Sequence, residues 1–131
     1  MRYFDCETDV KEMLGKTLVK IDGMERDSEK IIFTCSDGTQ YVMYHDQDCC
    51  EWVRIEEVIG NVTDLIGYPL MMSEDISETC EEPSVDYSMD DSHTWTWYKF
   101  ATILGYVTVR WLGESNGYYS EDVVFIERFY F

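Results

Sequence analysis

The chain has 131 residues, of which 45% are hydrophobic and 15% aromatic, so it can bury a core of its own and is not a disordered chain. Its 27 acidic residues outnumber 10 basic residues, and the net charge of −17 opposes binding to nucleic acid or to an anionic membrane surface. We therefore expect a single domain over residues 1–131 whose partner is a basic protein.

The five cysteines are an odd number and include the adjacent pair Cys49 and Cys50, which does not suggest a secreted disulfide framework. The first residues lack a signal-peptide-like apolar run, and no stretch of about 18 apolar residues occurs that would span a membrane. We expect reduced thiols in a cytoplasm, where clustered cysteine and histidine more often bind a metal than form disulfides.

The first half of the chain predicts short helices and several strands. Residues 8–15 predict a helix that begins at a Thr8 cap and ends at Gly15. Alternating apolar and polar residues predict strands over 17–22, 30–35, 40–45 and 52–58. Residues 36–39 predict a hairpin turn between the second and third of these strands. Residues 61–67 predict a helical turn, and residues 69–73 a short apolar strand.

An acidic segment follows at residues 74–91, and it contains no lysine or arginine. Its acids are Glu74, Asp75, Glu78, Glu81, Glu82, Asp86, Asp90 and Asp91. We predict an acidic loop, or partly an irregular sheet edge, and we assign these eight residues to partner binding, because long-range attraction to a basic surface depends on such a local field. The alternative is a solvated loop that only keeps the protein soluble.

The last third of the chain again predicts strands. Residues 94–104 alternate, with Trp95 and Trp97 on one face and Tyr98 and Phe100 on the other. Gly105 permits a turn into residues 106–112, and an Asn-Gly pair at 116–117 predicts a hairpin before a strand over 118–125. The expected fold class is α+β: a twisted antiparallel sheet of about six to eight strands with one or two short helices.

The stretch His45-Asp46-Gln47-Asp48-Cys49-Cys50-Glu51 has the residues of a metal site. Imidazole and thiolate ligands favour zinc over calcium or magnesium. His93, the only other histidine, or Cys35, on the neighbouring predicted strand, would supply a further ligand. The cysteines would equally serve as small core residues, and both can bind one ion only if the chain turns there.

Sequence templates for catalysis are missing: the chain has no phosphate-binding glycine loop, no GxSxG and no HExxH. The adjacent cysteines also lack the two-residue spacer of thioredoxin-like redox sites. We therefore expect a protein that acts by binding and not an enzyme.

Three motifs resemble a family of small phage and prophage proteins: residues 45–51, residues 94–98 (Thr-Trp-Thr-Trp-Tyr), and residues 110–121 (RWLGESNGYYSE). The resemblance runs from about residue 16 to residue 125, and this family is similar to type II anti-CRISPR proteins that contain zinc and inhibit Cas9. It implies a structural zinc held by His45, Cys49, Cys50 and His93, because other members carry cysteine where this chain has His93. It also implies protein binding in the cytoplasm of an infected bacterium.

The resemblance and the charge together predict an anti-CRISPR protein that docks on the positively charged surface of Cas9 and blocks loading of nucleic acid. One alternative is a phage sponge that sequesters a host nucleotide immune signal, for which Arg54 and Arg110 are the basic candidates. The other is a zinc-dependent enzyme acting on a host defence factor, with Glu51 or Glu114 as the base.

Overall fold

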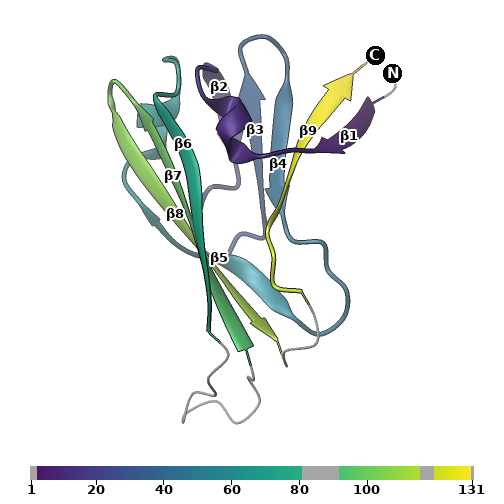
Figure 1. Cartoon of the computed structure of the whole chain (residues 1–131). Coiled ribbons are helices and arrows are strands. Elements are labelled where there is room, and N and C mark those ends of the chain that lie inside the picture. Colours follow the sequence, from purple (N-terminus) through teal and green to yellow (C-terminus); the bar gives the residue numbers. More distant parts are fainter. Residues whose placement is uncertain (1–2, 81–91, 116–119, 131) are drawn as a thin grey trace.

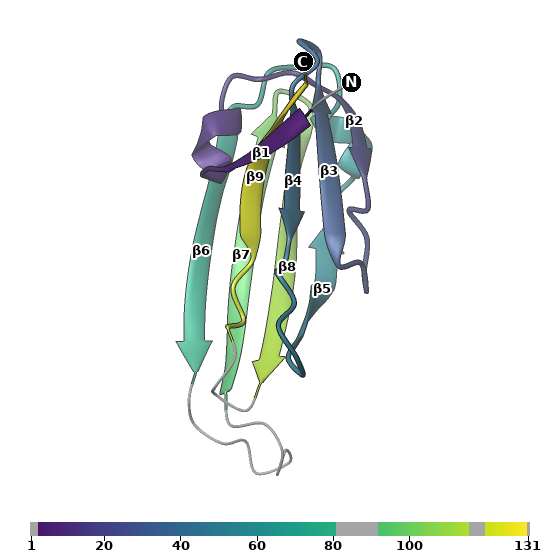
Figure 2. The same cartoon turned by 90° about the vertical axis from the view of Figure 1, so that its right-hand side faces the viewer.

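The computed structural model describes residues 3–80, 92–115 and 120–130, and these residues form two antiparallel sheets that pack face to face (Figures 1 and 2). The first sheet has the strand order β1 (Tyr3–Glu7), β9 (Val124–Tyr130), β4 (Gln40–Tyr44), β3 (Lys30–Cys35) and β2 (Leu18–Asp22). The second has the order β5 (Trp52–Ile59), β8 (Gly105–Ser115), β7 (Ser92–Thr102) and β6 (Met72–Cys80).

The inner faces of the two sheets share one hydrophobic core. Phe33 on β3 and Phe100 on β7 are fully buried, and their ring centroids lie 5.5 Å apart across the layers. Burying a side chain of this size stabilises the fold by about 1.5–3 kcal/mol. The alternation predicted for residues 94–104 is confirmed, since even-numbered residues of β7 are buried and odd-numbered ones lie on the outer face.

The mainly antiparallel β architecture expected from the sequence is confirmed, but the strands divide into two sheets and the described residues contain no α-helix. Their only helical segments are two four-residue 3-10 turns, η1 (Val10–Met13) and η2 (Val62–Leu65). The first is capped by Asp9 and not by the expected Thr8, and the chain leaves it at Gly15, which has φ 85° and donates its N–H to Leu70 O. The second has the expected Asn61 cap. The fold is thus mainly antiparallel β.

The acidic segment is also different from its prediction as a loop. Residues up to Cys80 belong to β6, which pairs continuously with β7 from Met72↔Ala101 to Cys80↔His93. Because β6 is an edge strand, its exposed acids Glu74 and Asp75 discourage pairing with another chain. The remaining acids, from Glu81 to Asp91, lie outside the described residues.

Two further strand predictions need correction. Residues 69–71 are not a strand, and β6 begins only at Met72: Pro69 makes an isolated bridge with Thr17, and Leu70 packs into the core. The last strand begins only at Val124, and residues 120–123 run extended toward it without pairing in either sheet. The hairpin predicted at residues 116–117 lies outside the described residues. The predicted hairpin between β3 and β4 is confirmed.

Candidate functional site

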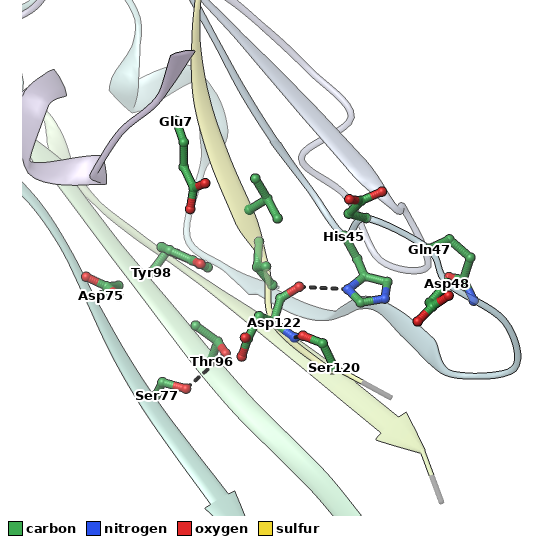
Figure 3. Close-up of a pocket in the computed structure, with 13 residues that line it drawn as sticks. Glu7, His45, Gln47, Asp48, Asp75, Ser77, Thr96, Tyr98, Ser120 and Asp122 are labelled. Atoms are coloured by element: carbon green, nitrogen blue, oxygen red, sulfur yellow. Dashed lines mark hydrogen bonds between the residues drawn. The ribbon is translucent and has the colours of Figure 1, made fainter. Parts of the chain in front are cut away.

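A cavity of about 610 Å³ opens between the sheets where β4 and the segment before β9 diverge from β6 and β7 (Figure 3). Five carboxylates line it: Glu7, Asp46, Asp48, Asp75 and Asp122. Uncharged hydroxyls of Ser77, Thr96, Tyr98 and Ser120 complete its polar wall. No lysine or arginine occurs in the lining contributed by the described residues, so the cavity is strongly acidic.

His45 forms one side of this cavity and joins two separate parts of the chain. Its Nδ1–H donates to the backbone oxygen of Asp122 at 2.7 Å, and its Nε2–H donates to Glu51 Oε2 at 2.9 Å. Each ring nitrogen of His45 is thus occupied by a hydrogen bond. The His45 side chain is 4% exposed and that of Glu51 is 0% exposed, which leaves neither ring nitrogen free for a metal.

Glu51 is the centre around which residues 45–51 fold. Its carboxylate accepts the backbone N–H groups of Asp48 at 3.0 Å and Cys49 at 2.8 Å, and the side-chain amide of Gln47 at 3.0 Å. Burial alone would raise the pKa of this carboxyl. The Cys49 N–H, the His45 ring and the Asp48 N–H outweigh burial and lower the pKa to about 2. Glu51 is therefore ionised and committed to structure, which argues against a role as catalytic base.

The proposed zinc ligands are not brought together. Cys49 and Cys50 lie on the exposed turn and are joined as a disulfide, where free thiols were expected. His93 is on the outer face of β7 beside Glu114, whereas His45 contributes to the cavity between the sheets. Among the residues that the structure describes, no group of three or more His, Cys, Asp or Glu side chains is arranged to hold a metal ion.

Cys35 does not serve as a substitute ligand in this arrangement. It ends β3 beside the turn to β4, while His45 follows the opposite end of β4, roughly 20 Å away at ~3.3 Å per residue. Its side chain is buried, and burial raises the pKa of the thiol to about 11. The thiol therefore stays protonated and packs in the hydrophobic core. The described arrangement thus does not fit a zinc site, and zinc stays a prediction that rests on the resemblance.

Glu121 is a second buried carboxylate, which the sequence did not single out. It accepts Thr94 Oγ1 at 2.8 Å and the hydroxyl of Ser115, and it is only 6% exposed. Gly113 makes room for it, since a Cβ built on Gly113 would lie 2.7 Å from the Glu121 Cβ. The sequence could have indicated this buried carboxylate, because Thr94 and Ser115 occupy strand positions whose side chains point inward and need a polar partner. This part of the 110–121 motif anchors residues 120–123, which line the cavity.

The expected partner-binding acids are only partly placed. Asp75 faces the cavity, Glu74 is exposed, and Glu78 belongs to β6. The assigned acids Glu81, Glu82, Asp86, Asp90 and Asp91 lie outside the described residues. The sequence missed the cavity acids Glu7 and Asp122, because they come from the two ends of the chain and meet only in the fold.

The two arginines considered for a nucleotide site are already paired. Arg54 donates to Glu114 at 3.2 Å and stacks 3.7 Å from the Trp52 ring centroid. Arg110 bonds Glu57 at 2.9 Å and lies over the Trp95 ring. Both lie on the outer face of the β5–β8–β7–β6 sheet, away from the cavity, so the described structure offers no support for a basic nucleotide pocket there.

None of the helices in the described residues is long and apolar enough to span a membrane. Comparisons with curated proteins and with solved structures give no significant match. A family model does match, and it covers residues 11–125, which include β2 to β8, the start of β9 and most of the cavity lining. The chain therefore belongs to the DUF7448 family, which is described as a domain of unknown function.

Proposed function

We propose that this protein is a non-catalytic binding protein that occupies the basic surface of a nucleic-acid-handling partner, with Cas9 as the first candidate. The observation that supports this most is the acidic cavity, whose five carboxylates have no ion-pair partner in the described residues. Basic side chains instead form ion pairs outside the cavity, as in Lys16–Asp37, Arg110–Glu57 and Arg128–Asp5. The excess negative charge is thus available to a partner.

The physical argument is one of complementarity. Cas9 holds guide and target in positively charged channels. An acidic domain on such a channel competes with nucleic acid for the same cations. The expected activity is stoichiometric inhibition in the bacterial cytoplasm during phage infection, and the Cas9 assignment rests on the resemblance together with the net charge of −17.

The test is to add the purified chain to Cas9 before or after guide RNA and to measure both co-elution on size exclusion and cleavage of target DNA. We expect a complex, with cleavage lost near equal molar amounts and with stronger inhibition when the chain is added before nucleic acid. Complete inhibition at a small fraction of the Cas9 concentration would instead indicate turnover. Failure to co-elute with Cas9 would contradict the choice of partner.

The zinc prediction has its own measurement. Metal analysis of protein purified without added metal should give a stoichiometric amount of zinc if the resemblance carries over, and His45→Ala and His93→Ala should lose it. Because Asp122 and Glu51 each occupy one ring nitrogen of His45, zinc binding would require release of the hydrogen bond at the nitrogen that binds the metal. Protein without zinc would contradict the prediction and leave the His45–Glu51 ion pair as the organising contact.

A further inference from the structure

Tyr98 carries a polar group that nothing in the fold uses. Its side chain is 4% exposed and extends from β7 into the cavity wall, on the side where Asp75 and Asp122 lie (Figure 3). Within the described parts of the chain, its hydroxyl makes no hydrogen bond. The Tyr98 oxygen is not among the fully buried polar atoms that lack a partner, so it opens onto the cavity, where a ligand or water can bond it.

The surroundings of this hydroxyl select the charge of the ligand. Burial, followed by the charges of Asp75, Asp122 and Asp9, raises the pKa of Tyr98, so the phenol stays protonated and neutral at physiological pH. The same negative field that disfavours a phenolate disfavours any anion in the cavity and favours a cation. An organic cation with several N–H donors would bond the carboxylates and also donate to the Tyr98 oxygen.

The size of the cavity selects the length of the ligand. About 610 Å³ is within the range of small-ligand sites, roughly 300–1,000 Å³, and is larger than one guanidinium group needs. Donors must reach carboxylates that enter from β6 on one wall and from the segment before β9 on the other. A short chain segment that carries basic side chains meets both requirements.

We propose that this cavity binds an arginine-containing peptide segment of the basic partner, with a guanidinium group between Asp75 and Asp122 and in contact with the Tyr98 hydroxyl. This inference deepens the proposed function and rests on it for the partner. Arginine is favoured over lysine because its planar fork offers five donors to several fixed acceptors, whereas ammonium offers three.

The test uses the full chain and a fluorescent Arg-Gly-Arg peptide, with binding followed by anisotropy. Matched probes replace arginine by lysine or by neutral citrulline, and spermidine serves as a free polyamine. We expect the arginine peptide to bind best and the citrulline peptide not to bind. Equal binding of the citrulline peptide would overturn the proposal, and so would tighter binding of spermidine than of the arginine peptide.

Variants of the cavity complete the test. Tyr98→Phe keeps the ring and removes only the hydroxyl, and it should weaken arginine-peptide binding roughly tenfold, as expected for a hydrogen bond to a charged group. Asp75→Asn with Asp122→Asn should abolish binding. The control pair Glu25→Gln and Asp27→Asn makes the same change in net charge on the β2–β3 loop and should leave binding unchanged. Unchanged binding in both cavity variants would overturn the proposal.

The two proposals fail separately. Peptide binding that depends on Tyr98, without any complex with Cas9, would refute Cas9 as partner and leave the cavity assignment intact. Co-elution of Cas9 that is equally strong for wild type, Tyr98→Phe and the Asp75→Asn, Asp122→Asn variant would refute the cavity assignment and leave the proposed function intact. Thermal unfolding of each variant confirms that the fold is retained before binding is compared.

Discussion

Glu51 shows how a single residue organises the most unusual motif of the chain. Its carboxylate is bonded by two backbone N–H groups of its own loop and by His45, which in turn holds the backbone of Asp122. The loop and the segment before β9 are therefore coupled through one ion pair. A pattern that looks like a set of metal ligands in sequence is, in the described structure, a hydrogen-bonded support for the cavity wall.

This role makes a pH prediction for Glu51. Its folded pKa of about 2 lies below the usual 4.5 of a glutamate, so its contribution to stability is fully present above about pH 4.5 and is lost as pH falls toward 2. We expect Glu51→Gln to be less stable than wild type at neutral pH. This difference in stability should shrink as pH falls from 4.5 to about 2. Urea unfolding at several pH values measures it.

A matched variant separates this effect from general acid sensitivity. Asp37 also has its pKa lowered to about 2, chiefly by the hydrogen bond from Lys16, but its side chain is half exposed. Asp37→Asn should therefore change stability much less than Glu51→Gln at neutral pH, since exposed pairs contribute about 0–1 kcal/mol. A difference between Glu51→Gln and wild type that stays constant down to about pH 2 would contradict the role given to the Glu51 carboxylate.

At the scale of elements, β7 and β8 were largely predictable, whereas the partition of strands into two sheets was not. Alternation is local, so burial of even-numbered residues on β7 follows from sequence. The choice of β8 as the partner of β5 depends on contacts such as Arg54 with Glu114, 60 positions apart. The acid-rich β6 was missed because its strand pairing with β7 outweighs the weak β preference of Glu and Asp.

The cavity could not be predicted from the sequence either, because its wall is formed by residues that are far apart in the chain. Its wall combines Glu7 from the end of β1, Asp75 from β6 and Asp122 from the segment before β9. Of the proposed metal ligands, His45, Cys49 and Cys50 were chosen because they are neighbours in sequence, and His93 because of the resemblance. In the described fold, β7 turns His93 outward while residues 45–51 close on Glu51.

The contact between β8 and the segment before β9 gives a prediction at this scale. A side chain at Gly113 would overlap Glu121, whose Cβ and backbone oxygen would lie 2.7 Å and 2.9 Å from the new Cβ. Gly113→Ala should therefore destabilise the fold by about 1–3 kcal/mol, which is typical of overpacking. Ser115→Ala removes the hydrogen bond to Glu121 without adding an overlap and should cost about 1 kcal/mol.

Chemical denaturation measures the free energy of unfolding of both variants, and binding of the arginine peptide is a second measurement. Because Glu121 precedes the cavity residue Asp122, displacement of this segment should weaken peptide binding more in Gly113→Ala than in Ser115→Ala. Gly113→Ala that unfolds like wild type would show that the segment before β9 is not fixed by this contact.

For the whole molecule, charge is the property that governs encounter with a partner. Exposed charges contribute little to folding, but they set the rate of association with a surface of opposite charge and its dependence on salt. Residues 74–91 carry eight acids and no lysine or arginine, and the described part of this segment contributes to one wall of the acidic cavity. The same charges would thus guide the partner toward the site that binds its basic segment.

We therefore predict that changing Glu78, Glu81, Glu82 and Asp86 to Gln or Asn slows association with the partner and flattens its salt dependence. The Debye length is about 10 Å at 0.1 M salt, so long-range attraction by these acids acts mainly at or below that concentration. The matched control changes four exposed acids elsewhere: Glu12, Glu25, Asp27 and Glu29. Stopped-flow association at several salt concentrations compares the two variants, and melting temperatures should barely differ from wild type. Equal rates for both would mean that net charge alone, and not its position within residues 74–91, determines the encounter.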